Sequence, residues 1–194
     1  TYNIVNFYKI HLLYKLAQKY DEVLYLDFDV VPMKSENFFE KWDLSKGIAI
    51  KDNNAQVIAM DGVTERTQTI RSPTSKYYNA QALLLDSGHN PKHKVVNTGI
   101  IGASKKHLDQ LAYFDNFSAD LKRMSDVREY HDMYPEKIRN FFGWDNETLW
   151  GVKQVENNVP VQWLDNEWHY HFNAQNFIPS EVVMCHTINK KFDV

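Results

Sequence analysis

The first segment of the chain has the hydrophobic spacing of an amphipathic helix. Its apolar side chains recur every three or four positions, at Ile4, Phe7, Tyr8, Leu12 and Leu16 with Leu13 on the flank. This spacing places them on one face of a helix. Asp21 ends the segment, and an apolar run at residues 23–26 follows. A run that is dense in apolar residues, without alternation, is typical of a buried parallel strand.

Short apolar runs and helical patterns alternate along the rest of the chain. We expect further strands at residues 47–50, 95–102, 161–164 and 182–185. Residues 37–42 are predicted as a short helix or a turn, and further helices are predicted from 105 into the 120s, at 135–142 and at 146–156. Residues 77–85 fit either a helix or a strand, and residues 52–76 are polar enough for loops and short strands. Alternating strands and helices predict a three-layer α/β domain.

The composition is that of an ordinary globular protein. Hydrophobic residues make up 43% and aromatic residues 14%, which excludes a disordered or collagen-like chain. A net charge of -3 argues against nucleic-acid binding as the main role. No apolar run approaches the roughly 18 residues that cross a bilayer. The single cysteine, Cys185, and the lack of a signal-peptide pattern favour a cytoplasmic location, and we expect one domain over residues 1–194.

Two aspartates, Asp27 and Asp29, follow the first apolar run directly. Side chains two residues apart on a strand point to the same face, so the two carboxylates converge at the end of the strand. Open α/β sheets bind ligands at the carboxyl ends of their strands. Neighbouring like charges are relieved by a divalent cation, and carboxylates suit Mg²⁺ or Mn²⁺, which in turn suit a diphosphate. The alternative is a pair of solvated acids on a loop.

The segment at residues 20–31, YDEVLYLDFDVV, resembles the DxD strand of nucleotide-sugar glycosyltransferases with the GT-A fold. The nearest likeness is to the retaining glycosyltransferase family 8. Three later segments are similar to motifs of that family in the same order: VNTGII at 96–101, WDNETLW at 144–150 and MCHTINKKF at 184–192. The resemblance implies a GT-A-like three-layer αβα sandwich with a mixed, mainly parallel central sheet. About two dozen residues precede Asp27, which implies that part of the N-terminal nucleotide-binding region is lacking.

The resemblance also implies a ligand set and a substrate-binding segment. Asp27, Asp29 and His186 would hold Mn²⁺ or Mg²⁺, and imidazole is a reasonable Mn²⁺ ligand beside two carboxylates. Substrate contacts would come from Asn97, Thr98 and Gly99. Glycine lets a backbone approach a sugar closely, and asparagine supplies both a donor and an acceptor.

Further roles are implied for residues near the end of the chain. Asp145 would hydrogen-bond sugar hydroxyls, and Asn146 would lie close to the anomeric carbon. A lysine, either Lys190 or Lys191, would neutralise the charge that develops on the leaving diphosphate. Asp145 also fits the N-cap of the helix that follows it, and the two roles are compatible.

Together these residues predict a metal-dependent glycosyltransferase. It would move a sugar from a nucleotide-diphosphate sugar, with a UDP-sugar as the expected donor, to a hydroxyl of a carbohydrate or glycoconjugate acceptor. The resemblance implies retention at the anomeric carbon. An inverting mechanism would instead need a carboxylate base near the acceptor, and Asp145 or Glu147 could fill that role.

Two other functions fit parts of the sequence. The run LDFDVV also fits the nucleophile strand of haloacid-dehalogenase-type phosphohydrolases, with Asp27 as nucleophile and Asp29 as acid and base. The later acidic metal pair of that family is not evident here. The third alternative is a non-catalytic carbohydrate-binding fragment. Metal-dependent nucleotide binding separates the transferase from this fragment.

His169 and His171 lie two positions apart in an aromatic-rich segment. On a strand they would share a face, so they either bind a metal or serve a structural role. The aromatic residues around them either stack on an acceptor sugar or pack in the core, and they are Trp163, Trp168, Tyr170 and Phe172.

Overall fold

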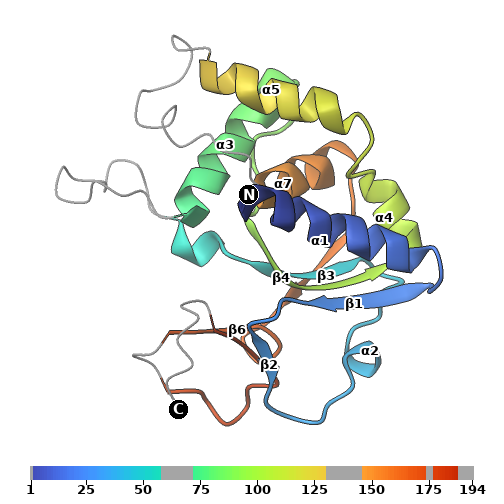
Figure 1. The fold of residues 1–194 in the computed structure, drawn as a ribbon. Helices are drawn as coiled ribbons and strands as arrows, with labels where there is room; N and C mark the ends of the chain where they lie inside the picture. The colour runs from blue at the N-terminus through green and yellow to red at the C-terminus, as the bar shows by residue number, and fades with distance from the viewer. Residues whose placement is uncertain (1, 58–71, 130–145, 174–176, 188–194) are drawn as a thin grey trace, which may run out of the picture.

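The computed structural model describes residues 2–57, 72–129, 146–173 and 177–187 (Figure 1). Its helices are α1 (Tyr2–Ala17), α2 (Phe38–Lys41), α3 (Ser72–Asp86), α4 (Lys105–Leu111), α5 (Phe117–Glu129) and α7 (Asn146–Glu156). Its strands are β1 (Glu22–Leu26), β2 (Val30–Pro32), β3 (Ile48–Asp52), β4 (Val96–Ser104), β5 (Val161–Leu164), β6 (Tyr170–Phe172) and β7 (Met184–Thr187). The predicted helix at 135–142 lies outside the described residues.

The strands form two sheets of mixed direction. The larger sheet has the order β1-β4-β3-β5, and the smaller has the order β2-β7-β6. In the larger sheet β4 is antiparallel to both β1 and β3, and only β3 and β5 run parallel. The mixed α/β class is therefore confirmed, but the expectation of a mainly parallel sheet is wrong for the described strands. A dense apolar run indicates that a strand is buried on both faces of its sheet. It does not indicate whether the neighbouring strand runs parallel or antiparallel.

Two hydrophobic cores lie on opposite faces of the larger sheet (Figure 1). On one face, α1, α3, α4, α5 and α7 bury a core that includes Ile10, Leu83 and Trp150. On the other face, α2 and the smaller sheet bury a second core around Phe38 and Trp168. In the described residues the third layer is thus mainly a small sheet rather than a helical layer. The short segments around β2, β6 and β7 supply the apolar side chains that cover this face.

Most predicted elements have the expected type, and three differ in detail. Residues 72–76, which were predicted as loops or short strands, belong to α3. Helix α1 buries Ile10, Leu13 and Ala17, whereas Tyr8 and Leu12 are exposed. The predicted face was wrong because α1 is apolar on more than one side, and the position of the sheet then decides which side is buried. The predicted long helix after Ser104 is two helices, because the chain turns at Ala112 and Asn116, which both have positive φ.

Capping residues explain where two of the helices begin. The Ser104 side chain accepts a hydrogen bond from the His107 N–H, which confirms the predicted N-cap of α4. The Asn37 side chain does the same for the Phe39 N–H at the start of α2. Helix α7 begins at Asn146 and ends at Glu156, as predicted. None of the described helices is both long and apolar enough to cross a membrane.

Candidate active site

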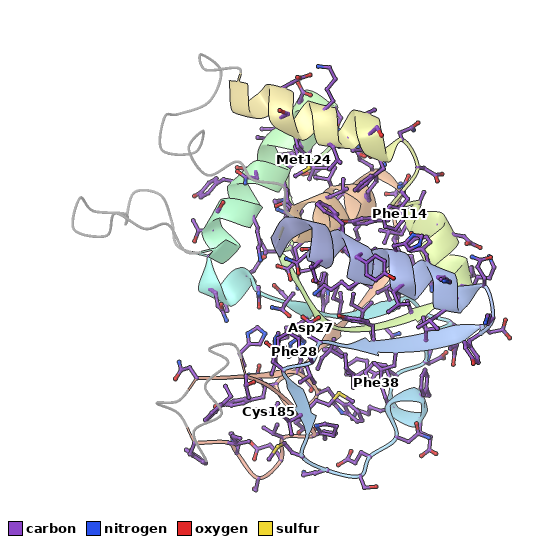
Figure 2. All side chains as sticks on the ribbon, viewed as in Figure 1. Asp27, Phe28, Phe38, Phe114, Met124 and Cys185 are labelled. Atoms are coloured by element: carbon purple, nitrogen blue, oxygen red, sulfur yellow. The ribbon has the colours of Figure 1, made fainter. Side chains whose placement is uncertain are left out.

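The first acidic residue of the site, Asp27, lies at the end of β1 next to the middle of β4. Its N–H donates to the carbonyl oxygen of Gly99 at 2.8 Å, which continues the β1–β4 ladder by one residue. The Asp27 side chain is partly buried. Figure 2 shows Asp27 between the larger sheet and the smaller one, with Phe28 beside it. The fold therefore places the predicted acidic motif against the predicted Asn-Thr-Gly segment.

Lys9 of α1 is a site residue that the sequence reasoning missed. Its Nζ lies 3.1 Å from Asp27 Oδ1 and 3.0 Å from Oδ2, and it also donates to the carbonyl oxygen of Thr98 at 3.1 Å. The Tyr25 hydroxyl donates to Asp27 Oδ1 at 2.7 Å. Burial and the Asp27 carboxylate raise the pKa of Tyr25, so the phenol stays a donor. The Asp27 carboxylate is thus held by one cation and one hydroxyl.

Asp29 and His186 are brought together by the pairing of β2 with β7. Val30 is the register partner of His186, and the Thr187 N–H and hydroxyl both donate to the Asp29 carbonyl oxygen, at 2.9 and 3.0 Å. His186 Nε2 lies 3.3 Å from Asp29 Oδ1. That carboxylate oxygen is buried and has no hydrogen-bond partner within the described part of the chain. A buried carboxylate oxygen without a donor is costly, and a cation bound beside it would offset that cost.

The residues Asp27, Asp29 and His186 fit a divalent cation. Each can offer one ligand atom, and these atoms all lie within 4.8 Å of one another. Burial lowers the pKa of His186 despite the opposing effect of Asp29 and Asp27, so its imidazole is neutral near pH 7 and has a lone pair to offer. Two carboxylates and one imidazole are a donor set that suits Mn²⁺ or Mg²⁺.

Gly99 is the residue that makes room for His186. A Cβ atom at this position would lie 2.7 Å from His186 Nδ1 and 2.9 Å from Asn97 Oδ1, closer than real Cβ contacts allow. The Gly99 N–H donates to Asn97 Oδ1 at 2.9 Å, so the two residues also fix each other. The space beside Gly99 is therefore occupied by the His186 ring of this protein. The sequence had predicted that a sugar would lie there.

Thr98 connects this segment to the start of α7. Its N–H and its hydroxyl both donate to Glu147 Oε1, at 2.7 and 3.0 Å. The Asn146 side-chain amide donates to the Thr98 hydroxyl at 3.0 Å. The other Glu147 oxygen is paired with Lys76 of α3. Glu147 is buried and both of its oxygens are occupied, so it positions β4 against α7 and is not available as a base.

Replacing Glu147 with glutamine should destabilise the protein at neutral pH. Burial raises the pKa of Glu147, but Lys76 and the Thr98 N–H lower it by more, so the folded-state pKa lies below the ordinary value of 4.5. The ion pair therefore stabilises the fold fully above about pH 4.5, and this stability is lost as the pH falls through the lower folded pKa. Removing one partner of a buried ion pair costs about 3 kcal/mol. Chemical denaturation of both proteins from pH 7 to pH 3 should show the difference shrinking with acid, and a constant difference would contradict this role.

The remaining predicted residues are placed as follows. Asp145, Lys190 and Lys191 lie outside the described residues. Asn146 is buried at the start of α7. Of the four aromatic residues, Trp168 is buried in the second core, and Trp163 packs against the first core with Lys94 Nζ 4.5 Å from its ring centroid. Phe28, between the two acids, is 80% exposed.

Comparisons with known proteins give structural likenesses at low identity. A scan of protein-family models finds no match, and a search of the curated proteins finds none either. Similar solved structures include an active-site mutant of LgtC, with 16% identity and a TM-score of 0.44. They also include the galactosyltransferase LgtC in complex with donor and acceptor sugar analogs, with 15% identity and a TM-score of 0.42. A third is the apo form of mouse xyloside xylosyltransferase 1, with 12% identity and a TM-score of 0.43.

The compared chains are longer than this one. The matches cover 91% of this chain in both LgtC structures and 92% in the xylosyltransferase, but only 57% and 63% of those chains. The chain thus spans somewhat less than two thirds of their length. At these TM-scores the functional argument depends on the geometry of the site itself.

Proposed function

We propose that the protein is a metal-dependent glycosyltransferase that takes its sugar from a nucleotide-diphosphate sugar, with a UDP-sugar as the expected donor. The observation that carries the proposal is the convergence of Asp27, Asp29 and His186 around a buried carboxylate oxygen that lacks a donor. These three residues would hold Mn²⁺ or Mg²⁺. When bound, the cation would act as a Lewis acid on the diphosphate oxygens and offset the charge of the leaving group.

Lys9 supports the same assignment. It brings a positive charge to within 3.1 Å of the Thr98 carbonyl oxygen and to the edge of the acidic pair. In the protein without a cation it balances the charge of Asp27. When the cation is bound, its ammonium group is placed to interact with an anionic or hydroxylated substrate at the same edge of the sheet. The lysine named in the sequence reasoning, Lys190 or Lys191, remains proposed for the leaving diphosphate.

Retention at the anomeric carbon is part of the proposal. An inverting mechanism needs a carboxylate base beside the acceptor. Glu147 is unsuited to that role because Thr98 and Lys76 occupy both of its oxygens. Asn146 donates its side-chain amide to Thr98 and is a poor nucleophile. A front-side substitution, helped by the leaving diphosphate, therefore fits these residues better than a double displacement. Asp145 remains proposed for binding the sugar hydroxyls.

The proposal is tested by incubating the protein with a panel of UDP- and GDP-sugars, Mn²⁺ and simple glycosides as acceptors. We expect release of the nucleoside diphosphate from one class of donor and loss of that release with EDTA. The anomeric configuration of the product, read by NMR, tests retention. Phosphate release from phosphate monoesters, together with covalent trapping of Asp27 by beryllofluoride, would instead identify a phosphohydrolase. No release from any donor, with binding of sugars alone, would support a non-catalytic carbohydrate-binding protein.

A further inference from the structure

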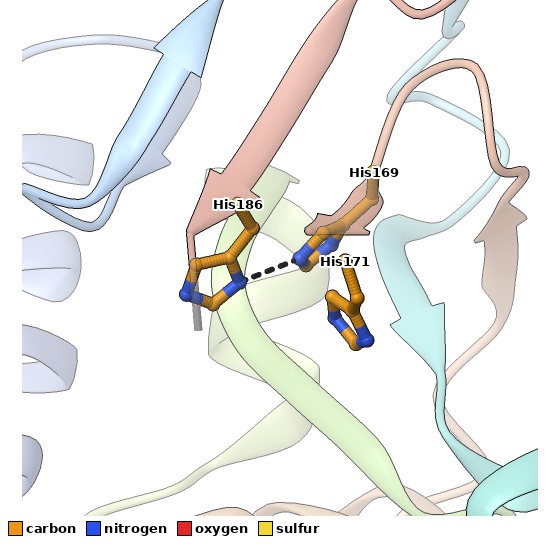
Figure 3. Close-up of side chains that lie close together, drawn as sticks. All are labelled: His169, His171 and His186. Atoms are coloured by element: carbon orange, nitrogen blue, oxygen red, sulfur yellow. Dashed lines mark hydrogen bonds between the residues drawn. The ribbon is translucent and has the colours of Figure 1, made fainter. Parts of the chain in front are cut away.

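Three histidines converge beside the proposed cation site. His169 directly precedes β6, His171 lies in β6, and His186 lies in β7. Strands β6 and β7 are parallel, and His171 is the register partner of His186. The ring centroids of His169, His171 and His186 form a nearly equilateral triangle with sides of 4.8, 5.2 and 5.6 Å (Figure 3). We call these three residues the histidine triad.

The nitrogen atoms of the histidine triad face one another in the interior. His169 Nε2 lies 3.0 Å from His186 Nδ1, and each residue can offer one nitrogen within 4.8 Å of the other two. His169 is fully buried. His171 Nε2 is also buried and has no hydrogen-bond partner among the residues that the structure describes. A buried imidazole nitrogen without a partner marks a point where an ion or a water can bind.

The second ring nitrogens of His186 and His171 have polar neighbours, whereas His169 Nδ1 has no hydrogen-bond partner among the described residues. The Asp29 carboxylate lies 3.3 Å from His186 Nε2 without accepting a hydrogen bond from it in this structure, and the Gln56 amide nitrogen lies 3.1 Å from His171 Nδ1. A carboxylate that accepts the proton of the second ring nitrogen fixes the tautomer and leaves the first nitrogen free to bind a metal. At His171 the Gln56 side chain has to turn its amide oxygen toward Nδ1 to do the same. Because Gly99 has no side chain, the His186 ring can lie directly against this part of β4.

We propose that the histidine triad binds a late transition metal of the Zn²⁺ type, and that this binding opposes cation binding at Asp27, Asp29 and His186. Three imidazoles favour Zn²⁺ over Mg²⁺ or Mn²⁺, which prefer the carboxylate-rich set. The two sites share His186. A neutral imidazole has one lone pair and one N–H, so His186 serves only one site at a time. When its Nδ1 binds the zinc-type ion, its Nε2 carries the proton and donates to Asp29.

The zinc site itself stands on the geometry of the histidine triad, whereas the opposition between the two metals depends on the proposed function. Zn²⁺ alone is the probe for the first part. Metal-free protein is titrated in competition with a chromophoric chelator, and melting temperatures are recorded with and without Zn²⁺. We expect one Zn²⁺ per chain and a higher melting temperature when it is bound.

Three variants locate the site. His171→Asn should weaken Zn²⁺ binding about 100-fold or more, because it removes one ligand. His89→Asn, a matched change at an exposed histidine, should bind Zn²⁺ like the wild type. Asp27→Asn, which removes a carboxylate of the proposed Mn²⁺ site but no outer partner of the histidine triad, should keep Zn²⁺ binding, which excludes the carboxylate site as its origin. The melting temperature of each metal-free variant shows whether the protein is folded. Equal Zn²⁺ binding by His171→Asn and the wild type, or no binding by the wild type, would overturn the proposal.

The opposition is read by Mn²⁺ electron paramagnetic resonance. One equivalent of Zn²⁺ per chain should weaken Mn²⁺ binding to the wild type at least about tenfold. Its effect on His171→Asn should be smaller, because only direct competition at the carboxylate site remains there. Unchanged Mn²⁺ binding in the zinc-loaded protein would refute the shared use of His186. Zn²⁺ binding by a protein that binds no nucleotide would leave the zinc site in place and count against the proposed function alone.

Discussion

Asp29→Asn is expected to lower the rate of sugar transfer by about 10²–10³-fold without destabilising the fold. Asparagine keeps the shape of the side chain but removes the charge that the proposed cation needs. In the protein without metal, Asp29 Oδ1 is buried beside a neutral imidazole and lacks a donor. Removing that buried charge should leave the free energy of unfolding unchanged or raise it by about 1–2 kcal/mol. Steady-state transfer assays and urea denaturation measure the two effects.

Two controls sharpen this prediction. Asp109→Asn, at an exposed position of α4, should change neither activity nor stability measurably. Asp27→Asn should also lower activity, but it should cost stability, because Lys9 and Tyr25 then lose a charged partner. An Asp29→Asn protein that is markedly less stable than the wild type would show that the carboxylate is held by the fold rather than reserved for a cation. Full activity in that variant would contradict its role as a ligand.

Gly99→Ala is expected to damage the site more than any other single-methyl change in the described residues. The added Cβ would lie 2.7 Å from His186 Nδ1, so either the imidazole or β4 has to move. We expect a loss of about 1–3 kcal/mol in the free energy of unfolding, which is typical of overpacking. Because His186 belongs to both proposed metal sites, Mn²⁺ and Zn²⁺ binding should both weaken at least about tenfold.

Two other glycines serve as matched controls. At Gly151 in α7, a Cβ would meet its nearest neighbour, the Lys94 carbonyl oxygen, at 3.8 Å. Gly151→Ala should therefore be neutral or stabilising by up to about 1 kcal/mol. At Gly102 a Cβ would lie 2.7 Å from Phe38 Cζ, and its three nearest atoms include none of a histidine. Gly102→Ala should destabilise the second core but leave metal affinity intact. Equal metal affinity in Gly99→Ala and Gly102→Ala would mean that Gly99 has no particular role at the site.

Several residues of the proposed cation site could be predicted from the sequence, because each lies in a short recognisable pattern. Asp27 and Asp29 follow a dense apolar strand, and the motif resemblance linked them to Gly99 and His186 although these are distant in sequence. The structure brings all four together, with Gly99 directly against the His186 ring. A local pattern does not specify the direction of neighbouring strands, which explains why the antiparallel pairing of β1 with β4 was not predicted.

The contact of Lys9 with Asp27 and the contacts among the three histidines depend on tertiary packing, so the sequence alone did not predict them. Lys9 reaches Asp27 only because α1 packs across β1 and β4. In the sequence it is a lysine between apolar positions of a helix, a pattern that Lys15 shares. The meeting of His171 with His186 depends on the pairing of β6 with β7. The spacing of His169 and His171 suggested a shared face, and the structure shows that their rings lie 4.8 Å apart. Nothing in that spacing pointed to His186 as the third member.

The most direct measurement is a calorimetric titration of UDP, and then GDP, into the protein with Mn²⁺ and again with EDTA. The wild type is compared with Asp27→Asn/Asp29→Asn, whose folding is checked by circular dichroism. The proposed site predicts binding of a nucleoside diphosphate only when Mn²⁺ is present, and loss of that binding in the double variant. Binding of GDP in place of UDP would correct the expected base and keep the metal site. Absence of binding under every condition, or metal-independent binding that survives in the double variant, would contradict a diphosphate–metal site at Asp27, Asp29 and His186.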